Sequence, residues 1–294
     1  MPWTALILFS LSVRPYGSQL HASVAPSHLI QCNRVKSVWQ SVQPLPVFPS
    51  ARHWIRFAHA RLGHLFRYLP RQSADNKRLN APGPLISHVI EALARQVPTW
   101  HGDLRLIDSI PLPCAAFRET VKRSEPAGQA GYGYCRSHSR FFRGFRLHLV
   151  TTAEGMPITW CLANPTVGER EVMAALLERD RRLVLAGQVI LADKGFAGKE
   201  LEAFLADRLG VHLVWPDRKD EPARHGKIAR VRQWIEAVID TFKGRLSLEQ
   251  CGGRIPAGVF ARTAQRLLAL AAGIWHNWTT NAKIERSLIA YDSQ

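Results

Sequence analysis

The sequence contains few cysteines, and they are far apart. The five cysteines are Cys32, Cys114, Cys135, Cys161 and Cys251. Their number is odd and no two form a CxxC pair, so the spacing excludes a disulfide framework and a cysteine zinc knuckle. The pattern fits a protein of the reducing cytoplasm.

Long apolar runs and several common catalytic motifs are also missing. No stretch approaches the 18 or more apolar residues of a membrane-spanning helix. The N-terminal MPWTALILFSLSV has no basic residue before a short apolar stretch that ends by Val13, which argues against a secretory signal peptide. The sequence has no GxxxxGK[ST], HExxH or GxSxG motif, so nothing indicates a P-loop NTPase, an HExxH zinc protease or a serine hydrolase of the GxSxG type.

Negative charge is scarce. The 294 residues include 39 Lys and Arg against 23 Asp and Glu, a net charge of +16, and the pI is about 10.3. Such an excess favours a polyanionic partner, most commonly nucleic acid. A ribosomal-type or merely soluble basic protein is the alternative. A hydrophobic content of 46% supplies ample material for a core.

The first third of the chain changes character near residue 50. Residues 1–50 show neither helical nor strand periodicity, and we expect them to be weakly structured. Residues 51–69 place apolar side chains at helical spacing, with Arg and His on the other face. That face suits a phosphate backbone, but equally the solvent side of an ordinary helix. With a second helix expected over 85–97, the sequence predicts a small helical module at 51–100, a candidate DNA-binding module.

From residue 104 the periodicity changes to that of strands. We expect strands at 104–108, 142–152, 156–164, 188–193 and 211–216, and helices at 168–183, 194–210, 231–243 and 259–278. A run of strands followed by alternating helices and strands predicts an α/β domain with a mixed sheet flanked by helices. This domain would span residues 101–294.

The segment 118–146 is basic and rich in aromatic residues. Its cations are Arg118, Lys122, Arg123, Arg136, Arg140, Arg143 and Arg146, interleaved with Tyr132, Tyr134, Phe141, Phe142 and Phe145. Arginine beside aromatic rings is typical of nucleic-acid grooves. A solvated loop with buried aromatic side chains fits the same composition.

Three acids stand out by position. Asp108 and Asp193 each end a strand-like run, where open α/β sheets keep their ligands. Glu236 lies at the edge of the apolar face of helix 231–243, on one stripe with Arg232 and Lys243. Three converging carboxylates would repel one another unless divalent cations lay between them, and hard oxygen ligands suit Mg²⁺ or Mn²⁺. Two such ions can clamp both oxygens of a phosphodiester displacement.

Simpler readings of these acids remain open. Aspartate at a strand end often begins a turn, and Glu236 with its two cations is also a surface ion-pair pattern. The other acids within reach are Asp103, Asp180, Glu200, Glu202 and Asp240. Asp103 precedes its strand, the next three lie on ordinary helical faces, and Asp240 is further from the apolar face than Glu236.

Several motifs together resemble one protein family. Arg232, Glu236 and Lys243 match the R-x3-E-x6-K signature of the DDE transposases of bacterial insertion sequences. The segments IDS (107–109), GYGYCRSHSRFFRGFRLHLV (131–150), ANPTVGEREV (163–172), ADKGF (192–196), LEQCGGR (248–254) and RSLIAYD (286–292) resemble the insertion-sequence 982 branch. The resemblance runs from about Trp54 to the C-terminus.

The resemblance implies a fold, a site and partners. It implies an RNase H-like core and two divalent ions, Mg²⁺ or Mn²⁺, held by Asp108, Asp193 and Glu236. Arg232 and Lys243 would hold DNA phosphates. A homodimer on two DNA ends, in the nucleoid of a bacterial cytoplasm, is the family's expected form. The further DNA-binding candidates are Lys194, Arg140, Arg143 and Arg146.

The expected function is therefore DNA transposition. Cutting at the element's end would free a 3′-OH, which would attack target DNA at the same site. Two alternatives remain: an RNase H-like nuclease that cuts without joining, and an inactive copy that only binds DNA. The second is raised by residues 1–50, which do not resemble the longer helical N-terminal region usual in the family.

Overall fold

The computed structural model describes residues 51–61, 63–65, 69, 71, 83–115, 130–135, 139–216, 229–250 and 256–288. The expectations for residues 1–50, for residues 118–129 and 136–138 of the basic segment 118–146, and for the loop before residue 229 lie outside these residues. Within them, no helix is long and apolar enough to cross a membrane.

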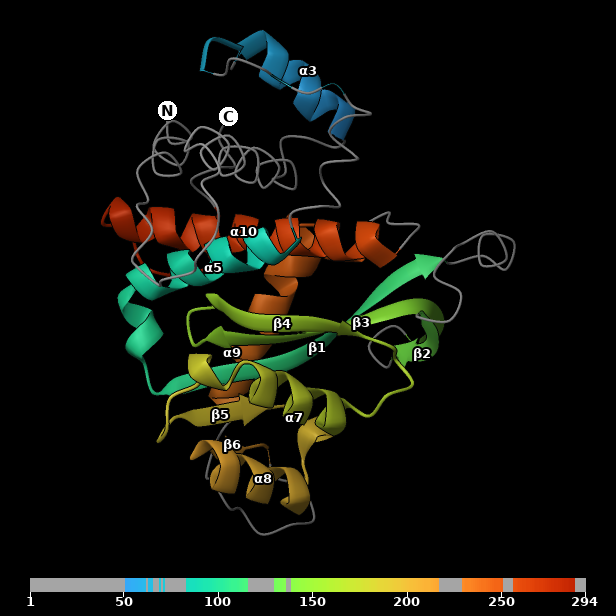
Figure 1. The fold of residues 1–294 in the computed structure, drawn as a ribbon, viewed down its shortest axis with the longest axis vertical. Coiled ribbons are helices and arrows are strands. Elements are labelled where there is room, and N and C mark those ends of the chain that lie inside the picture. Colours follow the sequence, from blue (N-terminus) through green and yellow to red (C-terminus); the bar gives the residue numbers. More distant parts are fainter. Residues whose placement is uncertain are drawn as a thin grey trace, which may run out of the picture.

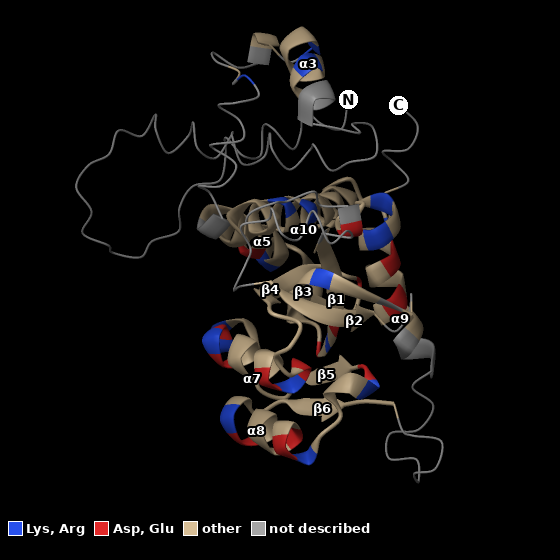
Figure 2. Ribbon diagram, turned by 90° about the vertical axis from the view of Figure 1, so that its right-hand side faces the viewer, with Lys and Arg blue, Asp and Glu red and all other residues tan. Residues whose placement is uncertain are grey.

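Two helices precede the sheet, as the periodicity predicts. They are α3 (Ala51–Arg61), followed by the 3-10 turn η1 (Gly63–Leu65), and α5 (Gly83–Gln96), followed by η2 (Pro98–His101). α5 packs against the C-terminal helix α10 (Pro256–Thr279) and belongs to the core of the sheet domain. α3 lies beyond α10 as seen from the sheet (Figures 1 and 2), and its Ile55 and Ala58 are buried members of the same hydrophobic cluster. A separate module at 51–100 stays a prediction.

The sheet is mixed. Its strands are β1 (Leu104–Ala115), β2 (Gly131–Cys135), β3 (Arg140–Thr152), β4 (Pro157–Ala163), β5 (Val189–Ala192) and β6 (His212–Val214). The order is β2-β3-β1-β5-β6, with β4 beside β3. The β1–β3, β2–β3 and β3–β4 pairs are antiparallel, and the β1–β5 and β5–β6 pairs are parallel. An antiparallel meander beside parallel strands that are linked through helices is the RNase H-like arrangement, and it confirms the expected fold class.

Two strand predictions need correction. β1 does not end at Asp108 but continues to Ala115, through two prolines. Beyond Ile107 the parallel partner β5 has ended, so β1 has only β3 beside it. A proline nitrogen that faces the open side then costs no ladder hydrogen bond. The second correction is β2, which lies inside the basic, aromatic-rich segment 118–146, where we expected no strand before residue 142.

Helices cover both faces of the sheet. On one face, Trp160 of β4 stacks on Phe260 of α10, with ring centroids 4.5 Å apart. On the other face, Thr159 donates a hydrogen bond to Asp180 at the end of α7 (Glu169–Arg179). α8 (Lys199–Leu209) packs beside α7. The remaining long helix, α9 (Ala229–Asp240), contacts β1 and packs on the α10 face.

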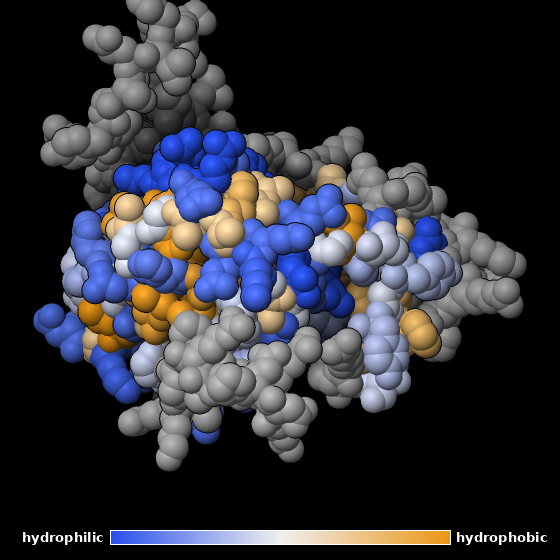
Figure 3. Space-filling view, turned by 90° about the horizontal axis from the view of Figure 1, so that it is seen from below, coloured by the Kyte–Doolittle hydropathy of each residue, from blue (hydrophilic) through white to orange (hydrophobic). Residues whose placement is uncertain are grey.

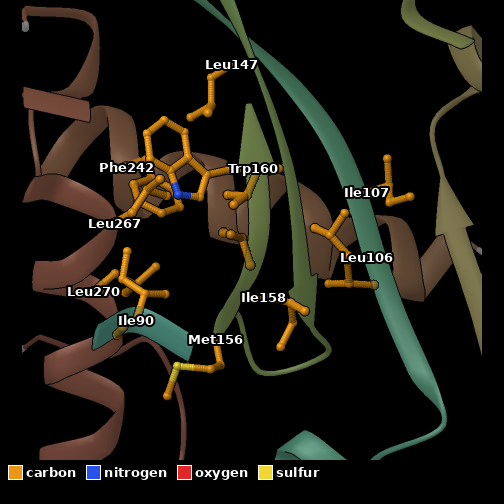
Figure 4. Close-up of a cluster of buried hydrophobic side chains, with 14 of the residues drawn as sticks. Ile90, Leu106, Ile107, Leu147, Met156, Ile158, Trp160, Phe242, Leu267 and Leu270 are labelled. Atoms are coloured by element: carbon orange, nitrogen blue, oxygen red, sulfur yellow. The ribbon is translucent and has the colours of Figure 1, made fainter. Parts of the chain in front are cut away.

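The hydrophobic core covers both faces of the sheet, and its larger part lies between the sheet and the α5–α10 layer. Figure 4 shows Phe242, Leu267 and Leu147 close to the indole ring of Trp160, with Leu106 and Ile107 of β1 further away across the strands. The indole N–H of Trp275 on α10 donates to Gln96 Oε1 at the end of α5, at 3.1 Å. Seen from the side of α8 and β6, the surface is mostly hydrophilic, with smaller apolar patches between the polar side chains (Figure 3).

Candidate active site

Asp108 and Asp193 lie on neighbouring parallel strands. The β1–β5 register ends with the pair Ile107 and Ala192, and the two aspartates are the next residue on each strand. The sheet therefore places them side by side, although 85 residues separate them in the sequence (193 − 108). Asp108 is half-buried within β1, and Asp193 is half-buried in the turn after β5.

The surroundings of Asp108 make its charge costly. Burial raises the pKa of Asp108 to about 7, and the negative charge of Asp193 acts in the same direction. Three groups oppose this rise: the backbone N–H of Ser109, which donates to Asp108 Oδ1 at 2.6 Å, and the positive charges of Lys243 and Arg146. Two adjacent acids in a half-buried place are an environment that a bound cation would stabilise.

The third predicted acid faces the same space. A cavity of about 130 Å³ is lined by Asp108, Leu191, Ala192, Asp193, Pro216, Ile235 and Glu236. The wall of the cavity thus combines the middle of β1, the end of β5, Pro216 after β6 and the middle of α9. α9 lies beside the sheet, where it contacts β1, and carries acidic positions along its length (Figure 2). Glu236 is exposed, rather than half-sheltered as the helical pattern suggests.

The three acids line one cavity but do not form a closed cluster. In the described part of the chain, no three His, Cys, Asp or Glu side chains converge closely enough to hold a metal ion. The donor chemistry nevertheless fits a hard divalent cation, because every candidate ligand is a carboxylate oxygen. The pair Asp108 and Asp193 carries the local excess of negative charge that such an ion neutralises.

The end of α9 departs from the ideal helix assumed for the signature. α9 continues into a π-helical turn, Thr241–Arg245, so Lys243 does not follow the 100° spacing that would put it on one stripe with Glu236 and Arg232. Lys243 Nζ instead lies 3.3 Å from Glu249 Oε1, and its charge acts on Asp108. π-Turns inside helices occur often at functional sites.

A fourth acid, which the sequence did not single out, supports the site from the other face of the sheet. Glu169 Oε1, at the start of α7, accepts a hydrogen bond from Ser109 Oγ at 3.0 Å and forms an ion pair with Arg146 of β3. Glu169 also lies against the turn after Asp193, since a Cβ at Gly195 would come within 2.5 Å of Glu169 Oε2. Glu169 therefore ties together three chain segments around the aspartates.

The remaining DNA-binding candidates are placed only in part. Lys194 is exposed in the 3-10 turn η4 (Lys194–Phe196), directly after Asp193. Arg143 is half-buried, with its guanidinium carbon 5.9 Å from the ring centroid of Tyr132. The side chains of Arg140 and Arg232 lie outside the described residues. Arg146 is engaged by Glu169, as above.

The competing acids are positioned differently. Asp180 accepts hydrogen bonds from Thr159 and from Arg179, the latter at 2.6 Å. Burial by itself would raise the pKa of Asp180. The two hydrogen bonds and the charges of Arg179 and Arg182 outweigh that effect, so the pKa of Asp180 is lowered. Asp240 is exposed on α9 and is absent from the residues that line the cavity. Among the described acids, the cavity is lined by Asp108, Asp193 and Glu236.

Comparisons with known proteins bear on this site. The curated proteins give no match. Among solved structures, the chain is similar to a Mos1 transposase paired-end complex with left transposon end, at 12% identity over 91% of this chain and 82% of that one, with a TM-score of 0.24. So low a score adds nothing to the fold assignment, which rests on the sheet itself. The model of the family described as "Transposase DDE domain" matches residues 100–272, more than half of the chain. The chain therefore belongs to the transposase DDE domain family and is a DDE transposase.

Proposed function

We propose that Asp108, Asp193 and Glu236 are the catalytic acids of this transposase and that they hold two Mg²⁺ or Mn²⁺ ions. The observation that carries the proposal is the cavity, which acids from β1, the end of β5 and α9 line together. Members of the family generally use divalent metal ions. Because Glu236 is exposed while the aspartates are half-buried, ion binding has to draw the Glu236 carboxylate toward the pair.

The side chains around the acids have separate roles in this proposal. Bound ions would lower the pKa of the attacking water or hydroxyl group and would stabilise the negative charge on the leaving oxygen. Lys243 and Arg146, whose charges act on Asp108, would hold the DNA phosphates on either side of the reacting bond. Glu169 and Glu249 fix these two cations through ion pairs. Lys194 would contact the backbone beyond Asp193.

The reaction proposed is cutting followed by joining. Water attacks a phosphodiester at the end of the insertion sequence and leaves a 3′-OH, which then attacks a phosphodiester of target DNA in the same cavity. Each step breaks one P–O bond and forms one, so no energy source beyond the DNA is needed. Arg232, Arg140 and Arg143 would add contacts to the backbone of the two DNA segments.

A strand-transfer assay separates this proposal from its alternatives. Pre-cut element ends with a free 3′-OH should be joined to target DNA by the wild-type chain and by an Asp180→Asn control. Asp108→Asn, Asp193→Asn and Glu236→Gln should abolish both cutting and joining while DNA binding persists. Cutting without joining would favour a nuclease. Binding with neither product would favour an inactive copy.

We propose that the chain belongs to the insertion-sequence 982 branch of these transposases. The segments quoted from residue 107 onward support membership of the insertion-sequence 982 branch, and sequencing of the DNA that flanks the gene tests it through inverted repeats. We propose a homodimer on two element ends in the bacterial nucleoid. Mass measurement of the protein with end DNA tests that assembly, because a monomer on each end would contradict it.

A further inference from the structure

The β2–β3 hairpin carries a group of aromatic rings that the fold leaves uncovered. Phe141 is 78% exposed, Tyr132 62% and Tyr134 43%. The rings of Tyr134 and Phe141 lie together, with centroids 5.0 Å apart and planes inclined by 58°. Most apolar residues of the described chain are buried, so three adjacent exposed rings are unusual enough to indicate a binding surface.

The strand register puts these rings on one face. Tyr132 pairs with Arg143 and Tyr134 with Phe141 in the antiparallel β2–β3 ladder. Directly opposed residues point to the same side of a sheet, and alternate residues of one strand share a face. Tyr132, Tyr134, Phe141 and Arg143 therefore form a single surface, which we call the hairpin platform.

The hairpin platform lies on the same sheet face as Asp108. Along β3, Phe141 and Leu149 are eight residues apart (149 − 141) and share a face, and Leu149 pairs with Asp108. Between them Phe145 and Leu147 are buried, so the helices cover the face only up to that point. The separation along the strand is about 27 Å at roughly 3.4 Å per residue, a length that about eight stacked nucleotides span.

The composition of the platform fits unpaired bases better than paired DNA. Flat rings on a sheet surface stack on exposed bases whatever their sequence, whereas the bases of a duplex already stack on each other. Arg143 lies beside the Tyr132 ring and brings a positive charge to the edge of the platform, where a strand's phosphates would pass. A second protein copy would gain nothing from that charge unless it brought an acidic surface.

We propose that the hairpin platform binds unpaired nucleotides of the DNA strand that reacts at Asp108, about eight nucleotides from the reacting phosphodiester. The inference rests on the proposed function, since it takes the cavity as the reaction site. It adds a separate base-stacking site on β2 and β3, which would hold a DNA end that has been opened near the cut.

The test compares two DNAs and four proteins in EDTA, where no cutting occurs. A duplex with a short unpaired thymidine tail and the same duplex with a blunt end are bound to the wild-type chain, Phe141→Ala, Phe141→Leu and Leu185→Ala. Leu185 is a matched control, exposed at 43% in the segment before β5. Loss of one stacked base should weaken binding to the tailed DNA by roughly 5- to 150-fold, leave blunt DNA unaffected and leave Leu185→Ala like the wild type.

The leucine variant distinguishes stacking from general apolar contact, and it should bind the tail nearly as poorly as the alanine variant. Equal preference for the tailed DNA in all four proteins would overturn the inference. The proposed function would still stand in that case if the four proteins cut DNA when metal is added. If Phe141→Ala instead lowers the molecular mass of the DNA-free protein without changing the tail preference, the platform is a contact between copies, and the inference is wrong.

Discussion

Replacing Asp108 by asparagine should stabilise the metal-free protein, and increasingly so as the pH rises. The pKa of Asp108 is about 7 in the fold against 3.8 for an ordinary aspartate, chiefly because of burial. A folded pKa above the unfolded one means that the associated stability is fully present below about pH 4 and is lost as the pH rises to about 7. Each pH unit in that window corresponds to about 1.4 kcal/mol.

The magnitude follows from the window. Between pH 5 and pH 8 the ionisation of Asp108 should cost the wild-type fold roughly 3 kcal/mol that Asp108→Asn does not lose. The assay is urea or thermal unfolding of both proteins in EDTA at the two pH values, where each kcal/mol moves the midpoint by roughly 2–4 °C. Asp180→Asn is the control: the pKa of Asp180 is lowered, so its loss should destabilise about equally at both pH values. A difference between Asp108→Asn and the wild type that does not change with pH would refute the reasoning.

Two further predictions concern the support of the site and the DNA contacts. Gly195→Ala should reduce strand transfer by roughly tenfold or more, because its Cβ would displace the Glu169 carboxylate. Gly168→Ala is the control and should behave as the wild type, because no atom lies within 4 Å of the added Cβ. Equal activity of the two variants would exclude the Glu169 contact as a support. DNA affinity should fall steeply with salt, by roughly 0.9 in the log–log slope for each phosphate contacted. Lys194→Ala should reduce that slope by about one, while Arg182→Ala, whose guanidinium is held by Glu91 at 2.8 Å, should not; an unchanged slope in Lys194→Ala would remove that residue from the interface.

The position of the aspartates was within reach of sequence reasoning because hydrophobic strands end in a predictable way. Val189–Ala192 is a short, largely buried run, and Asp193 follows it as expected. The prediction for Asp108 rests on a partly wrong reason, since a strand end was expected at Asp108, before Ser109 and Pro111, where β1 in fact continues. The parallel register, which a single sequence does not show, is what places Asp108 beside Asp193.

Other features depend on contacts that one sequence cannot reveal. Glu169 meets Arg146 from 23 positions away (169 − 146), and helical periodicity assigned it only to the start of a helix. The alternation of Gly131, Tyr132, Gly133 and Tyr134 is a strand pattern, but the many arginines around it drew attention to composition rather than to periodicity. Helical spacing puts Trp234 on the apolar face of helix 231–243, yet its side chain is 38% exposed.

The π-helical turn was missed for a similar reason. The sequence of Thr241–Arg245 gives no sign of a change in helical pitch, and the R-x3-E-x6-K signature assumes none. The consequence is local: Lys243 leaves the stripe of Glu236 and comes within ion-pair distance of Glu249. Signature spacing thus selects candidate residues but does not give their geometry.

The most direct test of the central claim is the binding of Mn²⁺, measured by electron paramagnetic resonance. The wild-type chain and Asp180→Asn should bind two ions with the same affinity, and Asp108→Asn, Asp193→Asn and Glu236→Gln should each weaken that binding by about tenfold or more. If Glu236→Gln binds Mn²⁺ as tightly and in the same number as the wild type, the three acids that line the cavity are not one metal site, and the account is contradicted.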